Sequence, residues 1–267
     1  MGLDSRALLA AYDAQLRAGP PGPLAPGVTV ERDGPLLRYT GFPFGGFVEY
    51  RDLDGLEGEA LDALIARQVA VFAERGERFE WKLHAHDLPA DLPDHLLAAG
   101  FVPEETETVV VGAVADIAGE PRLPDGVTLR EVTSRADLER IEEHIMTVWP
   151  DEGPVFADFL EGELAADPDA TVIVVAEADD AVVCAAWVRF APGRDFATLW
   201  GGATRQAWRG RGIYRAIVAY RANLAAQRRC RWLQVDATED SRPILERLGF
   251  VSVTTTTPYI WSPPPAA

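Results

Sequence analysis

The sequence predicts an α/β protein of the α+β type, built on a mixed sheet and divided into two similar domains. Three observations support this fold class. Strand-type and helix-type segments alternate along most of the 267 residues, a Gly- and Pro-containing stretch interrupts them near the middle, and the order of segments is similar on its two sides. The hydrophobic content of 48% is enough for a substantial core.

Residues 3–18 are expected to form a helix capped by Asp4 or Ser5, because Gly19-Pro20 ends the helical pattern and the stiff linker GPPGPLAPG follows. The rest of the first half alternates between the two types of segment. Strands are predicted at 47–53, 78–86 and 105–114, and helices at 61–72 and 92–101. At the other end of the chain, SPPPAA is expected to be a loose tail.

The second half opens with TVIVVAEADDAVVCAAWVRF (171–190), which predicts a hairpin around an acidic turn, and DFATLWGGAT (195–204) predicts the next strand. A helix follows, because apolar and aromatic residues recur at helical spacing from Ile213 to Leu224 and give it one face to pack on a sheet. Three segments complete this half: a strand at 231–237, a short helix at 241–250 and a strand at 251–261.

Both halves place a tryptophan-containing strand before a leucine-containing helix that ends in Gly-Phe. The interval is 20 positions from Trp81 to Phe101 and 18 positions from Trp232 to Phe250. This similarity favours a diverged internal duplication, with a boundary in AGEPRLPDG. The predicted domains are residues 1–118 and 125–262. The plainer interpretation is that any two α/β halves look alike at this level.

Composition argues against several classes of function. The net charge of −17 disfavours general binding to nucleic acids or anionic membranes and is compatible with a cationic partner. No window approaches the roughly 18 uncharged apolar residues of a membrane span, and the start of the chain lacks the pattern of a secretion signal. Cys184 and Cys230 are too few for a disulfide framework. We therefore expect a cytoplasmic protein with two reduced thiols.

One segment departs from the acidic balance. Between Arg205 and Val235 there are no Asp or Glu residues and eight arginines, at positions 205, 209, 211, 215, 221, 228, 229 and 231. A charge run is usually a solvated face, but this one coincides with the turn Arg209-Gly210-Arg211-Gly212 between a predicted strand and a predicted helix. Backbone N–H groups in such a turn, together with the helix N-terminus, attract phosphates. The segment therefore suits a pyrophosphate.

Two other phosphate-binding loops do not fit this turn. The sequence has no GxxxxGK[ST] motif, and the only lysine of the chain, Lys82, lies far from the turn. The dinucleotide fingerprint GxGxxG fails because Arg215 stands in place of its third glycine, and arginines 228, 229 and 231 stand where an acid is expected.

The hexapeptide Arg209-Gly210-Arg211-Gly212-Ile213-Tyr214 resembles the acetyl-CoA loop of the GNAT N-acetyltransferase superfamily, whose pattern is Arg/Gln-x-x-Gly-x-Gly/Ala. Tyr214 replaces the small last residue, which alters the space beside the cofactor and leaves the backbone donors in place. The resemblance continues through WLQVDA and ILERLGF, covers residues 126–262, and is faint over 28–115. It implies the GNAT acyltransferase fold, two GNAT-like domains, and acetyl-CoA as cosubstrate.

The resemblance also assigns site residues. Ala203 and Thr204 fall where the family uses main-chain groups to hold the pantetheine arm and polarise the thioester carbonyl, so Thr204 is a predicted catalytic position. The predicted pyrophosphate cradle consists of Arg209, Gly210, Arg211, Gly212, Ile213, Tyr214 and Arg215. Thr238 falls where the family often has an Asn, with Ser241 as the nearest other polar residue. Leu245 replaces the tyrosine that is often the general acid.

Five further side chains have a functional and a plainer interpretation. Asp236 lies beside the expected thioester and is a predicted general base acting through water; a solvated strand end or a helix cap is the alternative. Trp149 and Phe156 lie where the family's first helices close over the acceptor, and ordinary core packing is the alternative. His84 and His86 alternate onto one face of a strand, but without a third ligand at a recognised spacing no metal site is predicted.

We expect the protein to transfer an acetyl group from acetyl-CoA to the amine of a small molecule or peptide, by direct attack in a ternary complex. The acidic surface favours a cationic acceptor. Two rivals are a non-catalytic acyl-CoA sensor or regulatory module and a phosphate-loop nucleotide binder. The first-half segment aligned with the cradle, residues 49–62, carries six acids and one base, so we expect one acetyl-CoA per chain.

Overall fold

The computed structural model describes residues 4–17, 19, 22–150 and 153–264. The first half contains a helix, a three-stranded meander and then alternating helices and strands. These elements are α1 (Ser5–Leu16), β1 (Thr29–Asp33), β2 (Leu36–Thr40), β3 (Gly46–Glu49), α2 (Gly58–Arg75), β4 (Phe79–His84), α3 (Leu92–Ala98), β5 (Val102–Pro103), β6 (Glu107–Ala113) and α4 (Val114–Ile117).

The second half begins with a strand and two helices and continues with a meander. Its elements are β7 (Thr128–Val132), α5 (Arg135–Val148), α6 (Phe156–Ala166), β8 (Thr171–Ala178), β9 (Ala181–Phe190), β10 (Phe196–Thr204), the 3-10 turn η1 (Gln206–Trp208), α7 (Ile213–Gln227), β11 (Trp232–Ala237), α8 (Arg242–Arg247) and β12 (Val251–Trp261).

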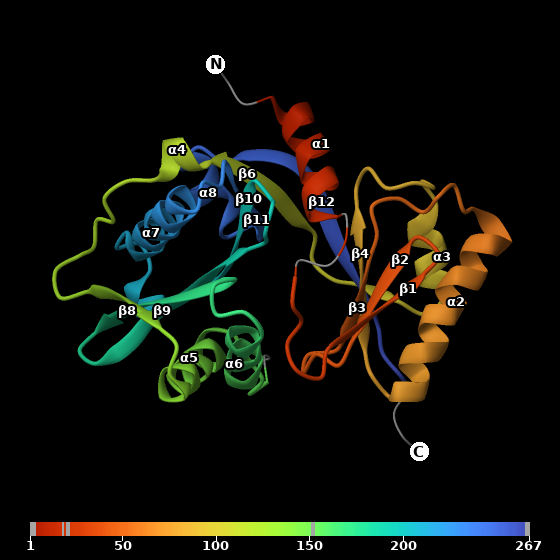
Figure 1. The fold of residues 1–267 in the computed structure, drawn as a ribbon, viewed down its shortest axis with the longest axis horizontal. Coiled ribbons are helices and arrows are strands. Elements are labelled where there is room, and N and C mark those ends of the chain that lie inside the picture. Colours follow the sequence, from red (N-terminus) through yellow and green to blue (C-terminus); the bar gives the residue numbers. More distant parts are fainter. Residues whose placement is uncertain (1–3, 18, 20–21, 151–152, 265–267) are drawn as a thin grey trace.

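All these strands belong to one mixed sheet, which confirms the predicted fold class. Their order is β1-β2-β3-β4-β12-β6-β11-β10-β9-β8-β7, and the short β5 pairs with β12. Figure 1 shows two lobes, one built around β1 to β4 and the other around β7 to β11, with β6 and β12 passing between them. Among the described residues, no helix combines the length and apolar character needed to cross a bilayer.

The two halves exchange strands at the middle of the sheet. β6 belongs to the first half by sequence, yet it pairs along its length with β11 of the second half. β12 belongs to the second half, yet Thr256–Trp261 pairs with β4 of the first. Because the sheet runs without a break through both halves, the domain division at residues 118 and 125 stays a prediction.

The same local topology occurs twice, as the predicted duplication implies. In each half an antiparallel meander leads to a parallel strand pair joined by one helix: β3 and β4 with α2, and β10 and β11 with α7. A shorter helix ending in Gly-Phe follows each pair, α3 in the first half and α8 in the second. The fold thus consists of two units of similar topology that share one sheet.

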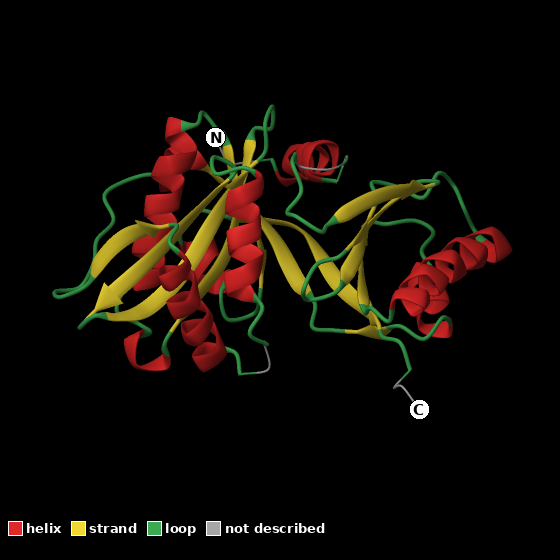
Figure 2. Cartoon of the chain, turned by 60° about the horizontal axis from the view of Figure 1, so that its bottom comes forward, coloured by secondary structure: helices red, strands yellow, loops and turns green. Residues whose placement is uncertain are grey.

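Helices cover both faces of the larger lobe (Figure 2). The core between α7 and α8 and the sheet contains Val218, Leu233 and Leu245, and the core under α5 and α6 contains Ile141, Leu160 and the indole of Trp187. Adjacent strand residues point to opposite faces, so Trp187 and Val188 enter different cores. In the smaller lobe, α2 and α3 cover one face through a core around the fully buried Trp81.

Helix α1 begins at the predicted cap: the Asp4 side chain accepts a hydrogen bond from the backbone N–H of Arg6 (3.1 Å). The helix lies over the junction of the two lobes, where Leu8 and Tyr12 pack against Val109 and Val111 of β6. Parts of the expected helix 3–18, of the linker at Pro20-Pro21 and of the tail at 265–267 lie outside the described residues.

Most predicted segments are present with shifted ends. The strand expected at 47–53 runs only from Gly46 to Glu49, and the helix expected at 61–72 is longer, from Gly58 to Arg75. Sequence reasoning did not predict the β1-β2 hairpin, β7 or α4. It anticipated the pair α5 and α6 only through the family resemblance.

Candidate active site

A cleft of about 2240 Å³ opens where β10 and β11 separate. These parallel strands pair only from Phe196 and Trp232 to Thr198 and Gln234. Beyond that point β10 continues to Thr204 and β11 to Ala237 with no recorded pairing between these described strands. Their facing edges can therefore offer backbone hydrogen-bonding groups to a ligand laid between them. β4 and the segment before β6 also line the cleft, so both halves build it.

The glycine turn lies at one end of this cleft. Gly210 (φ +74°) and Gly212 (φ +85°) both adopt the left-handed conformation that favours glycine, and Gly212 directly precedes α7. Within the described part of the chain, no hydrogen-bond acceptor is recorded for the backbone N–H groups from Gly210 to Arg215. Free donors at the N-terminus of a fifteen-residue helix form a cradle suited to a phosphate group.

The predicted cradle arginines differ in where their side chains go. Arg209 and Arg215 line the cleft, and Arg209 Nε donates to the carbonyl oxygen of Thr204 (3.1 Å). The guanidinium of Arg211 instead lies over the ring of Trp208, 4.7 Å from its centroid, and is not among the cleft-lining residues. Two of the three guanidinium groups can therefore face an anion in the cradle.

The other arginines of the acid-free segment have separate roles, so its charge does not act as one patch. Arg221 is 1% exposed and donates to the carbonyl oxygens of Trp187 and Trp200, both at 3.0 Å. Arg205 donates to Nδ1 of His144. Arg228, Arg229 and Arg231 follow at the far end of α7.

Tyr214 and the strand β10 fit together around two glycines. Gly201 (φ +68°) and Gly202 (φ +88°) interrupt the pairing of β10 with β9 as a bulge. A Cβ atom on Gly202 would lie 2.6 Å from Cε2 of Tyr214, so the tyrosine ring occupies the space that this glycine leaves. The large residue at the last position of the loop motif is thereby accommodated beside the cleft, which Tyr214 and Gly202 both line.

Ala203 and Thr204 line the cleft at the end of β10, as predicted. The Thr204 hydroxyl and the carbonyl oxygens of both residues already make hydrogen bonds within the protein. Thr204 Oγ1 donates to Sγ of the buried Cys184 (3.1 Å), and its carbonyl oxygen accepts from Arg209. The carbonyl oxygen of Ala203 accepts a hydrogen bond from Nε2 of the buried His144 (2.8 Å). A contribution of Thr204 to catalysis would therefore come from its backbone.

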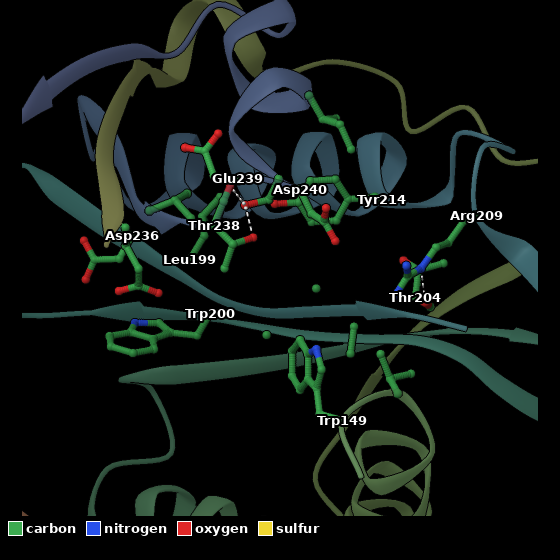
Figure 3. Close-up of a pocket in the computed structure, with 18 of the residues that line it drawn as sticks. Trp149, Leu199, Trp200, Thr204, Arg209, Tyr214, Asp236, Thr238, Glu239 and Asp240 are labelled. Carbon is green, nitrogen blue, oxygen red and sulfur yellow. Dashed lines mark hydrogen bonds between the residues drawn. The ribbon is translucent and has the colours of Figure 1, made fainter. Parts of the chain in front are cut away.

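Thr238 lies on the opposite wall of the cleft (Figure 3). Ser241 also lines the cleft, in the same turn between β11 and α8. The carbonyl oxygen of Thr238 accepts from the N–H groups of Ser241 (3.1 Å) and Arg242 (2.9 Å), which closes this turn. Leu245 is fully buried in the core under α8. A side chain at that position points away from solvent.

Asp236 projects into the cleft near Trp200, at the end away from Thr204 and Arg209 (Figure 3). Its Oδ2 atom accepts a hydrogen bond from Lys82 Nζ (2.8 Å), and its Oδ1 atom accepts one from Gln234 Nε2 (2.7 Å). Lys82 comes from β4 of the first half. Burial opposes its charge, but Asp236, Glu80 and Glu107 outweigh burial and hold the pKa of Lys82 well above its ordinary value.

Glu107, at the start of β6, is a cleft residue that sequence reasoning missed. Its Oε2 atom lies 3.7 Å from Lys82 Nζ. Its pKa is raised to about 7, chiefly by burial; Lys82 opposes this increase, and the charges of Asp236 and Glu80 add to it. The signal available in the sequence was the position of this acid in ETETVVV, two residues before the apolar run that starts at Val109.

Two exposed tryptophans stand on the same part of the cleft. Trp149 at the end of α5 is 39% exposed and Trp200 on β10 is 41% exposed. Trp149 therefore has the position expected of an acceptor-side residue. Phe156 does not: it packs against Trp187, 6.1 Å between ring centroids, beside the core under α5 and α6.

His84 and His86 lie outside this cleft. His84 Nε2 is 3.0 Å from the hydroxyl of Tyr12 on α1, and His86 Nε2 is 3.1 Å from Oδ1 of Asp13. Among the described residues no group of three or more His, Cys, Asp or Glu side chains is arranged to hold a metal ion.

Comparison with known proteins agrees with this geometry. Residues 137–250 match the model of the Acetyltransferase (GNAT) family. A comparison with curated proteins returns no sequence match.

The fold also resembles several solved structures. A GCN5-related N-acetyltransferase from Kribbella flavida has a TM-score of 0.66 at 16% identity, over 100% of this chain and 97% of that one. A conserved protein of unknown function from Staphylococcus epidermidis has 0.65 at 13%, over 90% and 96%. A tandem GNAT protein from the clavulanic acid biosynthesis pathway has 0.61 at 16%, over 91% and 86%. At these identities the likeness concerns the fold.

Fold, cradle and family match agree on the class: residues 137–250 are similar to a GNAT acetyltransferase domain, which indicates acyl transfer from an acyl-CoA. Residues 137–250 match the GNAT acetyltransferase model, and the first half of the chain contributes strands and side chains to the same cleft.

Proposed function

We propose that the protein is an N-acetyltransferase that moves an acetyl group from acetyl-CoA to a cationic amine acceptor. The observation that carries the proposal is the separation of β10 and β11 beside a cradle of unpaired N–H groups. A pyrophosphate at Gly210–Arg215 would meet backbone donors, a helix N-terminus and the guanidinium groups of Arg209 and Arg215. The pantetheine arm would then extend along β10 towards Ala203 and Thr204.

The charges of the cleft support a cationic acceptor. Its basic residues include the two arginines of the cradle, whereas its acids line the part near β11, β6 and α8. These acids are Glu104, Glu105, Glu107, Asp236, Glu239 and Asp240. Exposed Trp149 and Trp200 add aromatic surface, which also attracts cations. A polyanionic donor and a cationic acceptor would thus enter different parts of one cleft and meet near Trp200, beside Asp236 (Figure 3).

The chemistry is direct attack of a neutral amine on the thioester carbonyl carbon. Holding both reactants in one cleft makes the attack effectively unimolecular, and main-chain donors at the end of β10 can stabilise the developing oxyanion. Cys184 is unsuited to a covalent acetyl intermediate, because it is fully buried and burial raises the pKa of its thiol to about 11.

Calorimetry and CoA release together test this function. The intact chain should bind acetyl-CoA and release CoA with cationic amines, with a larger kcat/KM for a diamine than for an amino acid of similar size. Arg209→Glu and Gly212→Asp should remove the binding. Added salt should reduce the preference for the diamine. The proposal is overturned if the wild-type chain does not bind acetyl-CoA, or if both variants bind it with the wild-type affinity.

A second candidate is a non-catalytic acyl-CoA sensor. It is favoured by Leu245, because a fully buried leucine replaces the tyrosine that often protonates the leaving thiolate in this family. A sensor would bind acetyl-CoA with the same dependence on the cradle and release no CoA with any amine of a broad panel. CoA thiolate is a fairly good leaving group, so water in the open cleft can supply the proton and turnover is the result we expect.

A further inference from the structure

We propose that Glu107, supplied by the first half of the chain, is the general base that deprotonates the acceptor amine, and that Asp236 and Lys82 position it. This inference rests on the proposed acetyl transfer. It replaces Asp236, the sequence-based candidate, with a residue on the exchanged strand β6.

The sheet register places the three side chains on one face. Direct partners in an antiparallel pair point to the same side. Asp236 pairs with Val109 on β6, and Glu107 lies two positions from Val109, so both acids share a face. On β12, Thr256 pairs with Glu107 and Pro258 pairs with Lys82, which puts Lys82 on that face too.

Hydrogen bonding distinguishes the two acids. Both carboxylate oxygens of Asp236 accept short hydrogen bonds, from Lys82 and Gln234, and its side chain is 17% exposed. These hydrogen bonds occupy both oxygens of Asp236 and hold its side chain in place. Glu107 is 26% exposed, and its one recorded polar contact within the described residues is Lys82 at 3.7 Å. Its oxygens are therefore available to an ammonium group entering the cleft.

The charges around Glu107 support the assignment. Lys82 and Glu80 face it from β4 and Asp236 faces it from β11, while the nearest partner on β12 is the uncharged Thr256. On the α1 side, Tyr12 stays neutral because burial raises its pKa well above the ordinary value. The pKa of Glu107, about 7, suits a base that must accept a proton and release it again near neutral pH.

The ammonium group of the acceptor transfers one proton to the Glu107 carboxylate and becomes a neutral amine. The amine nitrogen forms a bond to the thioester carbonyl carbon, and collapse of the tetrahedral intermediate breaks the carbon–sulfur bond. The remaining excess proton on nitrogen reaches the CoA thiolate through solvent. Glu107 then returns its proton to water, so that the products are an amide, CoA and one proton.

The test compares the pH dependence of kcat/KM in two near-isosteric variants, Glu107→Gln and Asp236→Asn. Glu107→Gln should lower turnover by about 100-fold or more and remove the part of the rising limb near pH 7. Asp236→Asn should keep the rising limb of the pH–rate profile but move it to lower pH. Asp236 raises the pKa of Glu107, so its removal leaves the lowering effect of Lys82 less opposed. Glu107→Asp should restore part of the rate. Glu74→Gln, at an exposed position on α2, is the matched control.

Acetyl-CoA affinity, measured by calorimetry, should be the same in all these variants, which shows that they fold and keep the cradle. If the rising limb of the pH–rate profile persists in Glu107→Gln and disappears in Asp236→Asn, Glu107 is not the base. The proposed acetyl transfer would be unaffected by that result. A wild-type chain that binds acetyl-CoA and acetylates no amine overturns the proposed function and, with it, the base.

Discussion

Lys82 Nζ lies 2.8 Å from Asp236 Oδ2, joining β4 of the first half to β11 of the second across 154 positions of sequence. The pair stands at the acidic side of the cleft, beside Glu107. The first half therefore does more than enlarge the sheet: it supplies the only lysine of the chain and a carboxylate to a cleft whose cradle belongs to the second half.

Replacing Lys82 with methionine should move the rising limb of the pH–rate profile to higher pH. Without the ammonium group, burial and the charges of Asp236 and Glu80 act on Glu107 unopposed, so its pKa rises above about 7 and less of it is ionised at neutral pH. Turnover should fall at pH 7 and recover near pH 9. A limb at its original position in Lys82→Met would contradict this account of Glu107.

Arg215→Gln should weaken acetyl-CoA binding by about 10-fold, because a charge-assisted hydrogen bond to a phosphate is worth roughly 1.5–3 kcal/mol and is reduced by exposure. Arg211→Gln should have a smaller effect, since its guanidinium stacks on Trp208 outside the cleft lining. Arg229→Gln, beyond the far end of α7, is the control. Calorimetric titration at two salt concentrations checks the order; equal losses in Arg211 and Arg215 variants would show that net charge alone matters.

The sequence was informative where a function depends on neighbouring residues. The glycine turn, the strand before it and the helix after it are local, so Gly210 and Gly212 could be assigned correctly to one turn before α7. Charge counting was less informative, because it does not distinguish a buried structural arginine such as Arg221 from one that lines the cleft.

The acceptor side could not be predicted in the same way. The contact between Lys82 and Asp236 exists because β6 inserts beside β11 and β12 reaches β4. The sequence of β6 or β12 does not reveal which strand it pairs with. A strand shows the same alternation of side chains whether its partner belongs to its own half or to the other half. The β1-β2 hairpin was missed for a related reason: β1 has no fully buried residue, so its hydrophobic pattern is weak.

Gly202→Ala should disturb the cradle through Tyr214. The added methyl group would lie 2.6 Å from the tyrosine ring, and the backbone at φ +88° is strained for any residue with a Cβ atom. We expect the free energy of unfolding to fall by about 1–3 kcal/mol and acetyl-CoA affinity to fall as the ring moves. Adding Tyr214→Ala should restore part of the affinity by removing the clash. If the single and double variants bind acetyl-CoA equally well, the loss of affinity does not arise from displacement of the Tyr214 ring.

Asp87→Asn should destabilise the attachment of α1. Asp87 accepts from Arg17 Nη2 (2.6 Å), from the Tyr50 hydroxyl (2.6 Å) and from the N–H of His84 (2.8 Å). Although burial opposes its charge, hydrogen bonds from His84 and the charge of Arg17 hold the pKa of Asp87 well below its ordinary value. Loss of one partner from such a buried pair costs about 3–5 kcal/mol.

The pH dependence of this effect follows from the lowered pKa. The contribution of Asp87 is fully present above its unfolded pKa, about 3.9, and is lost as pH falls below it. Urea unfolding should therefore show a large difference between wild type and Asp87→Asn at pH 7 and a smaller one at pH 3. Asp116→Asn, at an exposed position on α4, is the control. A difference that is independent of pH would contradict the ionic interpretation.

The protein should bind one acetyl-CoA per chain, although its topology is repeated. The first-half counterpart of the cradle follows β3, where residues 49–62 carry six acids and one base. Tyr50 also closes the end of the β3-β4 pair: its buried side chain donates to Asp87, and its hydroxyl lies 3.5 Å from the carbonyl oxygen of Lys82. A pyrophosphate there would meet repulsion instead of charge-assisted hydrogen bonds. Calorimetry with the chain quantified by amino-acid analysis should give a stoichiometry of about one. Arg209→Glu should abolish all binding, and a residual site in that variant, or a stoichiometry near two, would show that the first copy also binds the cofactor.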